Sequence, residues 1–82
     1  MKEIIINCAG VETPAQMHKK LKDALLFPEW YGNNLDALFD CLCEAEVSLT
    51  LQGWKTLGKW REGFWSTMLD AAQENPLFTF KE

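Results

Sequence analysis

The sequence predicts an α/β fold with a small, three-stranded parallel β-sheet. Three short segments carry the apolar patterns of strands, and helical segments separate each one from the next along the chain. Strands that are joined through helical crossovers lie parallel to one another, with right-handed connections. Since the chain has 82 residues, of which 48% are hydrophobic, residues 1–82 are expected to form a single small domain.

The first strand and the first helix follow from the N-terminal third of the chain. Ile4-Ile5-Ile6 is a β-branched run, which predicts a short buried strand over residues 2–7. Thr13-Pro14-Ala15-Gln16 then has the residue types of a capping box, with proline at the first helical position. Apolar residues at helical spacing continue from there, so a helix is predicted over residues 14–26.

A loop and a second helix come next. Pro28 and Gly32 bracket the loop, which holds a tryptophan and a tyrosine. Either Asn33 or Asn34 is expected to cap the helix that follows, because asparagine is a preferred N-cap residue. This helix is predicted to run to about Glu44, with its leucines facing the core.

The second helix has a separate acidic face. Asp36, Asp40 and Glu44 follow one another at intervals of one turn, and Phe39 and Cys43 fall on the border between the acidic and the apolar face. Side chains one turn apart have Cβ atoms about 5–6 Å from each other, so the helix presents a row of negative charges. An ordinary solvated helix face is the simplest structural explanation of such a row.

The C-terminal half predicts two further strands and one long helix. Residues 47–52 alternate strictly between apolar and polar, as in a strand with one apolar face. Residues 54–60 suit a short helical turn, and residues 61–74 suit an amphipathic helix that ends before Pro76. A final strand is predicted over residues 77–80. The apolar stripe expected on the long helix consists of Phe64, Trp65, Met68, Leu69 and Ala72.

Charge is distributed unevenly along the chain. Between Lys22 and Lys55 there is no lysine or arginine, and this segment contains six acids. The segment therefore has a formal charge of −6, the rest of the chain has +2, and the total is −4. Large aromatic residues stand among these acids. The combination is typical of a surface that meets a basic partner, whereas direct nucleic-acid binding would require a basic face.

The sequence also disfavours a membrane protein and a secreted, disulfide-bonded protein. No segment is long and apolar enough for a membrane span, and the N-terminal apolar run is too short for a signal peptide. Three cysteines are too few for a disulfide framework. A cytoplasmic protein without membrane association is therefore expected.

No metal, cofactor or catalytic site is expected. Cys41 and Cys43 project about 200° apart around their helix, so they are not expected to hold one metal ion together. Asp36 and Asp40 could form an acid/base pair like that of a glycosidase, but no nucleophile motif, Gly-rich loop or second histidine accompanies them. His18, at the edge of the apolar face of its helix, is expected to have a packed or a capping role rather than a catalytic one. Buried structural roles are expected for Cys8, Cys41, Tyr31, Trp54, Trp60 and Trp65.

The central third of the chain resembles a known protein family. The residues that carry the resemblance are Pro28-Glu29-Trp30-Tyr31-Gly32-Asn33-Asn34-Leu35-Asp36-Ala37-Leu38-Phe39-Asp40-Cys41-Leu42. This string is similar to that of barstar, the intracellular inhibitor of the secreted bacterial ribonuclease barnase. The resemblance implies a three-stranded parallel sheet with helices packed mainly on one side. It also implies that the protein blocks a ribonuclease active site, for which we expect a 1:1 complex and a monomeric free form.

The resemblance implies a partner-binding surface as well. In barstar-like proteins the second helix and the loop before it enter the basic cleft where RNA phosphates would lie. Carboxylates are suited to this role because they accept bidentate hydrogen bonds from arginine, as phosphates do. Asp40, at the centre of the acidic face, is expected to be the most important contact. The residues assigned to this surface are Trp30, Asn34, Asp36, Phe39, Asp40, Cys43 and Glu44, with Asp70 as a peripheral acid.

The chain also departs from the barstar pattern. Trp30 stands where barstar has a tyrosine, Phe39 stands where it has a tryptophan, and Asn33 replaces an acid. Residues 44–46, Glu-Ala-Glu, occupy the region where barstar has small residues and a tryptophan. These differences favour a related barnase-like ribonuclease or a toxin nuclease domain as partner over barnase itself. The alternative function is that of an acidic interaction module that binds a basic partner other than a nuclease.

Overall fold

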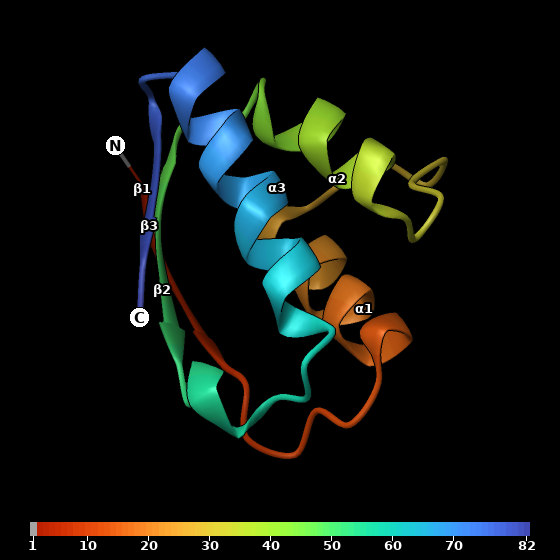
Figure 1. Cartoon of the computed structure of the whole chain (residues 1–82). Coiled ribbons are helices and arrows are strands. Elements are labelled where there is room, and N and C mark those ends of the chain that lie inside the picture. Colours follow the sequence, from red (N-terminus) through yellow and green to blue (C-terminus); the bar gives the residue numbers. More distant parts are fainter. Residues whose placement is uncertain (1) are drawn as a thin grey trace.

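A computed structural model describes residues 2–82 and confirms the predicted α/β fold. The strands form one parallel sheet in the order β1-β2-β3. Figure 1 views this sheet nearly edge-on, with all three α-helices on one side of it, as the resemblance implied. In chain order the elements are β1 (Lys2–Asn7), α1 (Pro14–Leu25), α2 (Leu35–Leu42), β2 (Val47–Gln52), the 3₁₀ turn η1 (Trp54–Thr56), α3 (Arg61–Glu74) and β3 (Phe78–Lys81).

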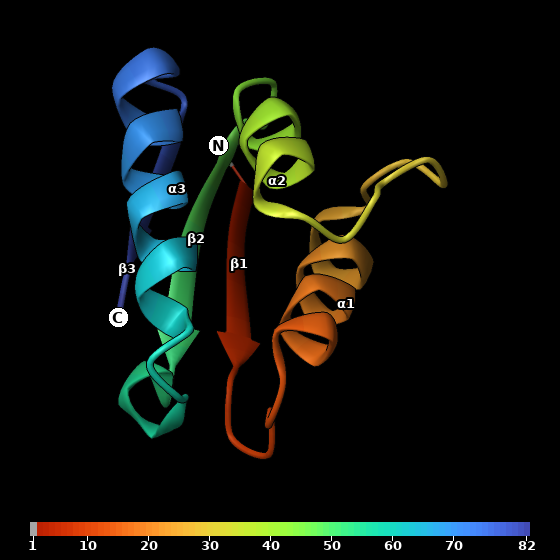
Figure 2. The same cartoon turned by 45° about the vertical axis from the view of Figure 1, so that its right-hand side comes forward.

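The central strand β2 organises the sheet. Leu49 lies opposite Ile4 of β1 and Phe80 of β3 in the parallel register. Val47, Leu49 and Leu51 are buried beneath the helices, and the polar residues between them point to the open face, because successive side chains alternate along a strand. The alternating pattern of residues 47–52 thus predicted both the strand and its buried face. Figure 2 shows β2 between the other two strands, with α3 in front of β3 and α1 beside β1.

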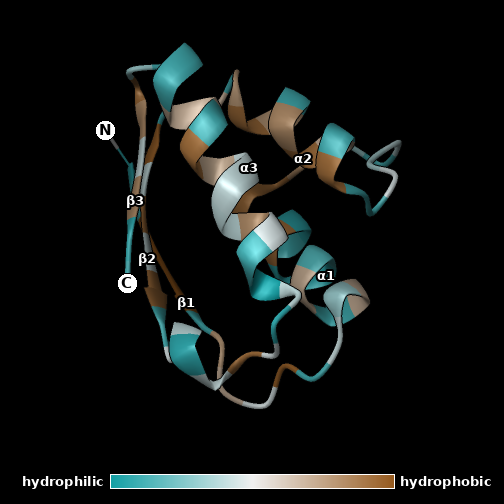
Figure 3. Cartoon of the chain, in the orientation of Figure 1, coloured by the Kyte–Doolittle hydropathy of each residue, from teal (hydrophilic) through white to brown (hydrophobic). Residues whose placement is uncertain are grey.

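The first strand is less buried than its sequence suggested. A continuous β-branched run predicted burial on both faces, but β1 lies at the edge of a sheet that has helices on one face only. Ile6 points to the helices and is buried, whereas Ile5 points to the open face and is 63% exposed. Figure 3 shows apolar residues along β1 and β2 and at intervals along each helix. The apolar run therefore identified the strand but not its place in the sheet.

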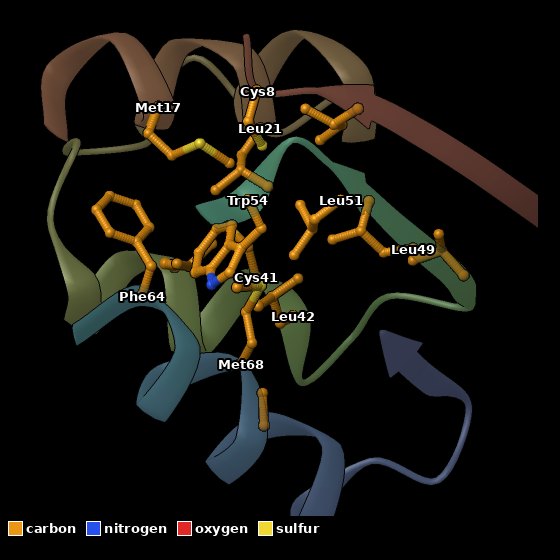
Figure 4. Packing of buried hydrophobic residues seen from close by; sticks show 14 of the residues in the cluster. Cys8, Met17, Leu21, Cys41, Leu42, Leu49, Leu51, Trp54, Phe64 and Met68 are labelled. Atoms are coloured by element: carbon orange, nitrogen blue, oxygen red, sulfur yellow. The ribbon is translucent and has the colours of Figure 1, made fainter. Parts of the chain in front are cut away.

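The core fills the space between the sheet and the helices. Met17 and Leu21 of α1, Leu42 of α2 and Met68 of α3 converge there with residues of β2 (Figure 4). Trp54, Cys8 and Cys41 are buried, as predicted, while Trp60 and Trp65 are partly buried and pack against the core.

The stripe predicted for α3 needs one correction. Leu69 was placed in the core, but it is 46% exposed. Phe64, Met68 and Ala71 are the residues of α3 that are buried. They follow one another at intervals of four and three residues and form one narrow face, and Leu69 lies about 100° farther around the helix than Met68. The buried face of α3 thus includes a small residue that hydrophobicity alone did not select.

The helix boundaries follow local hydrogen bonds. The capping box at the start of α1 is present, because Thr13 Oγ1 accepts a hydrogen bond from Gln16 N and Gln16 Oε1 accepts one from Thr13 N, both over 3.2 Å. α1 ends at Leu25, one residue before the predicted end, and α2 ends at Leu42 rather than Glu44. Across residues 2–82, no helix is both long and apolar enough to cross a lipid bilayer.

Candidate partner-binding surface

The loop between α1 and α2, residues 26–34, is held by one buried residue. Tyr31 is 5% exposed, and its hydroxyl is hydrogen-bonded to Nδ1 of His18 in α1 over 2.6 Å. The ring of Phe27 packs on that of Tyr31, with a centroid distance of 4.9 Å. The neighbouring Trp30 points outward and is 68% exposed. The prediction that Tyr31 belongs to the core is therefore confirmed, and of the two roles considered for His18 the structure shows the packed one. Trp30 is free to meet a partner.

Asn34, rather than Asn33, begins α2. Its Oδ1 accepts a hydrogen bond from Ala37 N over 2.8 Å, and its Nδ2 donates to Gly32 O over 3.3 Å. A Cβ atom on Gly32 would lie 2.9 Å from Asn34 Nδ2, so the absence of a side chain at residue 32 leaves room for the cap. Asn34 is exposed, but its side chain already serves the helix N-terminus and thereby positions the acids that follow.

The three acids Asp36, Asp40 and Glu44, called the acidic row below, are exposed to solvent. Within the part of the chain that the structure describes, none of them forms a salt bridge. Two ion pairs are found there. Lys19 pairs with Asp23 within α1, and Lys22 of α1 pairs with Glu29 of the loop that follows. The acidic row is thus a run of negative charge that no basic side chain of residues 2–82 pairs with.

The helix α3 runs beside α2 in the same direction. At the start of both helices, a Cβ atom on Gly63 would lie 3.2 Å from Cδ1 of Leu35. At their ends, Asn75 Nδ2 donates hydrogen bonds to Leu42 O and Ala45 O, over 3.0 and 2.7 Å. Asp70 follows Gly63 by seven residues, which is nearly two turns, so it lies on the side of α3 that faces α2. The peripheral acid of the resemblance is therefore placed beside the α2 surface, where it is exposed.

Glu74 belongs to the same region, although the sequence analysis did not select it. It lies one turn after Asp70 on α3, and this spacing was the available signal. The negative charge of Glu74 acts on Cys43, the C-cap residue of α2. The pKa of the Cys43 thiol is raised above its ordinary value, first by partial burial and then by the negative charges of Glu74, Asp40 and Glu44. Cys43 is therefore a neutral thiol at neutral pH and is unsuited to act as a nucleophile.

On the other side of α2, a hollow of 270 Å³ separates the helix from the preceding loop. Asp40 and Glu44 form its acidic wall, together with Cys41 and Ala45. Burial, followed by the charges of Asp40 and Glu44, raises the pKa of the Cys41 thiol. The apolar wall consists of Leu25, Leu26, Phe27, Pro28 and Trp30.

Leu26 is a second residue that the sequence analysis missed at this surface. It is 76% exposed, more than any other large hydrophobic residue of the described chain. Nothing in the sequence signalled this, because a leucine at that spacing also suits the buried face of α1. The exposed apolar area beside the acidic row is therefore larger than Trp30 alone provides.

A larger hollow of 650 Å³ lies elsewhere, between β1 and α1. Its polar residues include Lys19 and Lys20, and Lys20 Nζ already donates a hydrogen bond to Asn7 O over 2.9 Å. It shares no residue with the hollow beside α2. Its larger volume does not make it the better candidate for the partner-binding site, because the acidic row lies on and just after α2 and the exposed Trp30 lies in the loop before it. Among residues 2–82, no group of three or more histidine, cysteine or acidic side chains could hold a metal ion.

Comparison with known proteins decides the family. The sequence pattern described as "Barstar (barnase inhibitor)" matches residues 1–76. The chain belongs to the barstar family. The protein YrdF of Bacillus subtilis (strain 168) is 35% identical over 77 residues, which are 90% of this chain and 85% of the relative. YrdF carries the provisional name of a ribonuclease inhibitor.

In this barstar-family chain, the residues predicted to bind a partner, called the strip below, come from the loop before α2, from α2 and the residues just after it, and from α3. Trp30, Asp40 and Glu44 surround the hollow on one side of α2. Phe39 and Cys43 are partly buried on the opposite flank, toward Asp70 and Glu74 of α3. Asp36 lies in the first turn of α2, above the asparagine cap. The strip thus combines separate negative charges with two aromatic residues, Trp30 on one side of them and Phe39 on the other.

Proposed function

We propose that this barstar-family chain inhibits a barnase-like secreted ribonuclease or a toxin nuclease domain. It would bind the enzyme as a 1:1 complex in the cytoplasm and cover the basic active site with α2 and the preceding loop. The observation that carries this proposal is the acidic row, which forms no salt bridge within residues 2–82 and has Trp30 on one side and Phe39 on the other. It is found in a chain of the barstar family. Inhibition by binding requires no catalysis by the chain itself.

The acidic row suits a cleft built to hold RNA. A ribonuclease binds phosphates through basic side chains, and a carboxylate accepts the same bidentate hydrogen bonds from arginine. Asp36 and Asp40 are one helical turn apart, with Cβ atoms about 5–6 Å from each other, a distance of the same order as the spacing of phosphates on a strand. Because no base among residues 2–82 pairs with these acids, binding a basic cleft does not first require an ion pair within that part of the chain to break.

The aromatic residues suit the same surface for a different reason. Aromatic side chains supply much of the binding energy at the centres of interfaces. Trp30 is exposed and Phe39 is partly buried, so each could lose accessible apolar area against the enzyme. A flat ring beside the acidic row also resembles a base beside its phosphate, and nucleases bind bases by stacking.

The surface is already ordered in the free chain. The hydrogen bond between Tyr31 and His18 fixes the loop, Asn34 caps the start of α2, and Asn75 holds its end. A surface that is ordered before binding loses less conformational entropy when a complex forms. This order supports a tight, stoichiometric inhibitor.

Titration of enzyme activity tests the proposal. A panel of purified barnase-type ribonucleases and toxin nuclease domains is assayed for RNA cleavage while the chain is added. We expect at least one enzyme to lose its activity at close to one equivalent. The double variant Asp36→Asn/Asp40→Asn should fail to inhibit, whereas Glu46→Gln, an exposed acid outside the strip, should behave like the wild type. If the chain binds an enzyme and leaves its activity intact, it is an interaction module rather than an inhibitor.

A further inference from the structure

The larger hollow, between β1 and α1, lies at the free edge of the sheet and is called the edge groove below. β1 pairs with β2 on one side only, and α1 lies beside its other side (Figure 2). The volume of 650 Å³ is within the range of about 300–1,000 Å³ that ligand pockets have. We propose that the edge groove binds one extended acidic segment of a partner protein, which adds a fourth strand antiparallel to β1. This inference goes beyond the proposed function, because the edge groove shares no residue with the strip.

The backbone of β1 presents unpaired groups to this edge. Both backbone groups of a strand residue point to one side, and those of the next residue point to the other. Cys8 N donates to a carbonyl group of β2 over 2.8 Å, whereas Asn7 O, on the opposite side, accepts from Lys20 Nζ over 2.9 Å. Residues 3, 5 and 7 therefore direct their backbone groups away from β2. Within residues 2–82 nothing is hydrogen-bonded to the backbone of Glu3 or Ile5 on that side, and an added strand would satisfy these groups.

The charged residues of the edge groove favour an acidic occupant. Lys19 and Lys20 line it, and Asp23 is the one acid among its described lining residues. Lys20 uses one of its three ammonium donors on Asn7 O, so two remain for a carboxylate. The ion pair between Lys19 and Asp23 is exposed, and exposed pairs contribute little to stability, so Lys19 can change partner at small cost. Because both lysines belong to α1, the acidic side chains of the added strand should point toward that helix.

Ile5 determines the other face of the added strand. Its side chain is 63% exposed on the open face of the sheet. In an antiparallel pair the opposite residue has its side chain on the same face, where an apolar pair stabilises the two strands. Since successive side chains alternate, an apolar residue opposite Ile5 places both of its neighbours on the side of α1. The pattern acidic, apolar, acidic therefore fits the edge groove.

The position of α1 favours a single segment over a second copy of this chain. A two-fold axis that joined two β1 strands as an antiparallel pair would leave both helix layers on the same face of the joined sheet. Each α1 lies beside its own β1 edge, so each would be driven into the helix layer of the other copy (Figure 2). A lone strand carries no such helix and can lie beside β1 without this conflict.

Binding of short peptides to the full chain tests the inference. Amide resonances are followed by NMR while acetyl-Thr-Glu-Val-Glu-Thr-amide is added, and acetyl-Thr-Lys-Val-Lys-Thr-amide is the charge-reversed control. We expect shifts confined to β1 and to the lining residues of α1, and about fivefold weaker binding of the lysine peptide. With the glutamate peptide at about ten times its Kd, hydrogen exchange of the Glu3 and Ile5 amides should slow about tenfold. The Ile4 and Ile6 amides already face β2 and should slow much less; equal effects at all four would overturn the proposal.

Methylation of single peptide nitrogens tests the hydrogen bonds directly. In the antiparallel pair, the valine N–H of the peptide donates to Ile5 O, whereas the N–H groups of its glutamates point away from β1. N-methylation of the valine should weaken binding by about tenfold or more, because it removes a hydrogen bond and places a methyl group against the strand. N-methylation of the second glutamate is the matched control and should change the affinity by less than about twofold. Equal losses for the two peptides would refute strand addition.

Variants of the chain test the same groups from the other side. Ile5→Pro removes the N–H that faces the edge groove and no bond to β2, and edge strands accept proline in this orientation. Peptide affinity should fall about tenfold, whereas Ile5→Thr, which keeps the N–H, should stay within about threefold of the wild type. If Ile5→Pro does not fold, the methylated peptides decide the same point.

Lysine variants test the charge of the edge groove. Lys19→Gln/Lys20→Gln should bind the glutamate peptide about fivefold more weakly. Lys55→Gln, at an exposed lysine outside the groove, is the control and should bind it like the wild type. Equal affinities of these two variants would overturn the acidic character of the occupant.

Nuclease inhibition and self-association give separate outcomes. Asp36→Asn/Asp40→Asn should bind the glutamate peptide like the wild type, and Ile5→Pro should inhibit a nuclease like the wild type, so either idea can fail alone. Loss of peptide binding in the aspartate variant would overturn the independence of the edge groove. If the concentrated chain protects the Glu3 and Ile5 amides without peptide and sediments as a dimer, the edge joins two copies and the proposal is wrong.

Discussion

The hydroxyl of Tyr31 lies 2.6 Å from Nδ1 of His18, and this bond joins the α1–α2 loop to α1 inside the core. Both residues are buried, and the ring of Phe64 packs on His18 with a centroid distance of 4.6 Å. The bond thus fixes the residue next to Trp30 to the rigid part of the molecule. The position of the exposed tryptophan therefore depends on a contact that is buried in the core.

Tyr31→Phe should reduce stability. The change removes the hydroxyl and leaves a buried polar atom of His18 without its partner, which costs about 1–3 kcal/mol of unfolding free energy. Chemical denaturation of the variant and the wild type measures the difference. A second variant, His18→Phe/Tyr31→Phe, removes both polar groups and should lose less than His18→Phe and Tyr31→Phe lose together, because the two residues share one bond. Additive losses would contradict the coupling.

Stability should also fall as the pH drops below the ordinary range of histidine. Burial lowers the pKa of His18 from its ordinary value of 6.5. Below pH 6.5 the unfolded chain therefore binds a proton that the folded chain does not, so acid favours unfolding. The stabilisation is complete above the unfolded pKa and is lost as the pH falls from there toward the lowered folded pKa. Denaturation at a series of pH values measures this slope, which His18→Phe should lack over the same interval.

Periodic patterns made most of the fold predictable from sequence. The alternation in 47–52 fixed both the strand and its buried face, and the capping box fixed the start of α1. Burial on the open face of β1 was not predictable, because a run such as Ile4-Ile5-Ile6 does not state how many faces of its sheet are covered. Leu69 was misplaced because hydrophobicity favoured the leucine over Ala71, although it is Ala71 that lies on the buried face of α3.

The candidate site was predictable along one helix but not between elements. Helical spacing alone placed Asp36, Asp40 and Glu44 on one face. Leu26 was missed because its exposure depends on the loop conformation, for which the local sequence pattern carries no signal. The spacing of Glu74 from Asp70 placed the two acids on one side of α3, but the position of that side next to α2 depends on the packing of the two helices.

Asn75 links two of these elements and should be sensitive to mutation. Its Nδ2 donates to the carbonyl oxygens of Leu42 and Ala45, at the end of α2, and its Oδ1 accepts from Leu77 N over 3.0 Å. Asn75→Ala would remove these three hydrogen bonds, each of which contributes about 0.5–1.5 kcal/mol, so we expect a loss of about 2–4 kcal/mol in unfolding free energy. Asn75→Asp keeps the acceptor and removes the donor. Chemical denaturation should show that Asn75→Asp is also destabilised; a wild-type value would exclude the donor role.

Asp40→Asn should weaken inhibition more than any single change at the rim. Asp40 is the middle acid of the acidic row and lines the hollow, so its carboxylate would be buried among basic groups of the enzyme. Loss of one partner in a buried charge pair costs about 2–5 kcal/mol, or roughly 30-fold to several-thousand-fold in the inhibition constant. Barnase–barstar is itself the reference case for such coupling, so this range is borrowed from the family. Inhibition assays should show little change for Glu46→Gln, and equal constants for the two variants would contradict a central role of Asp40.

Association with the nuclease should slow sharply as salt is added. The acidic row is exposed and unpaired within residues 2–82, so its field reaches a basic enzyme before contact, and dissolved ions screen that field. Stopped-flow measurements between about 20 and 200 mM salt should show a fall of about tenfold or more in the association rate. Asp36→Asn/Asp40→Asn should associate more slowly at low salt and show a flatter dependence, while its dissociation rate reports the loss of direct contacts. A wild-type rate that is constant over this range would exclude electrostatic steering by the acidic row.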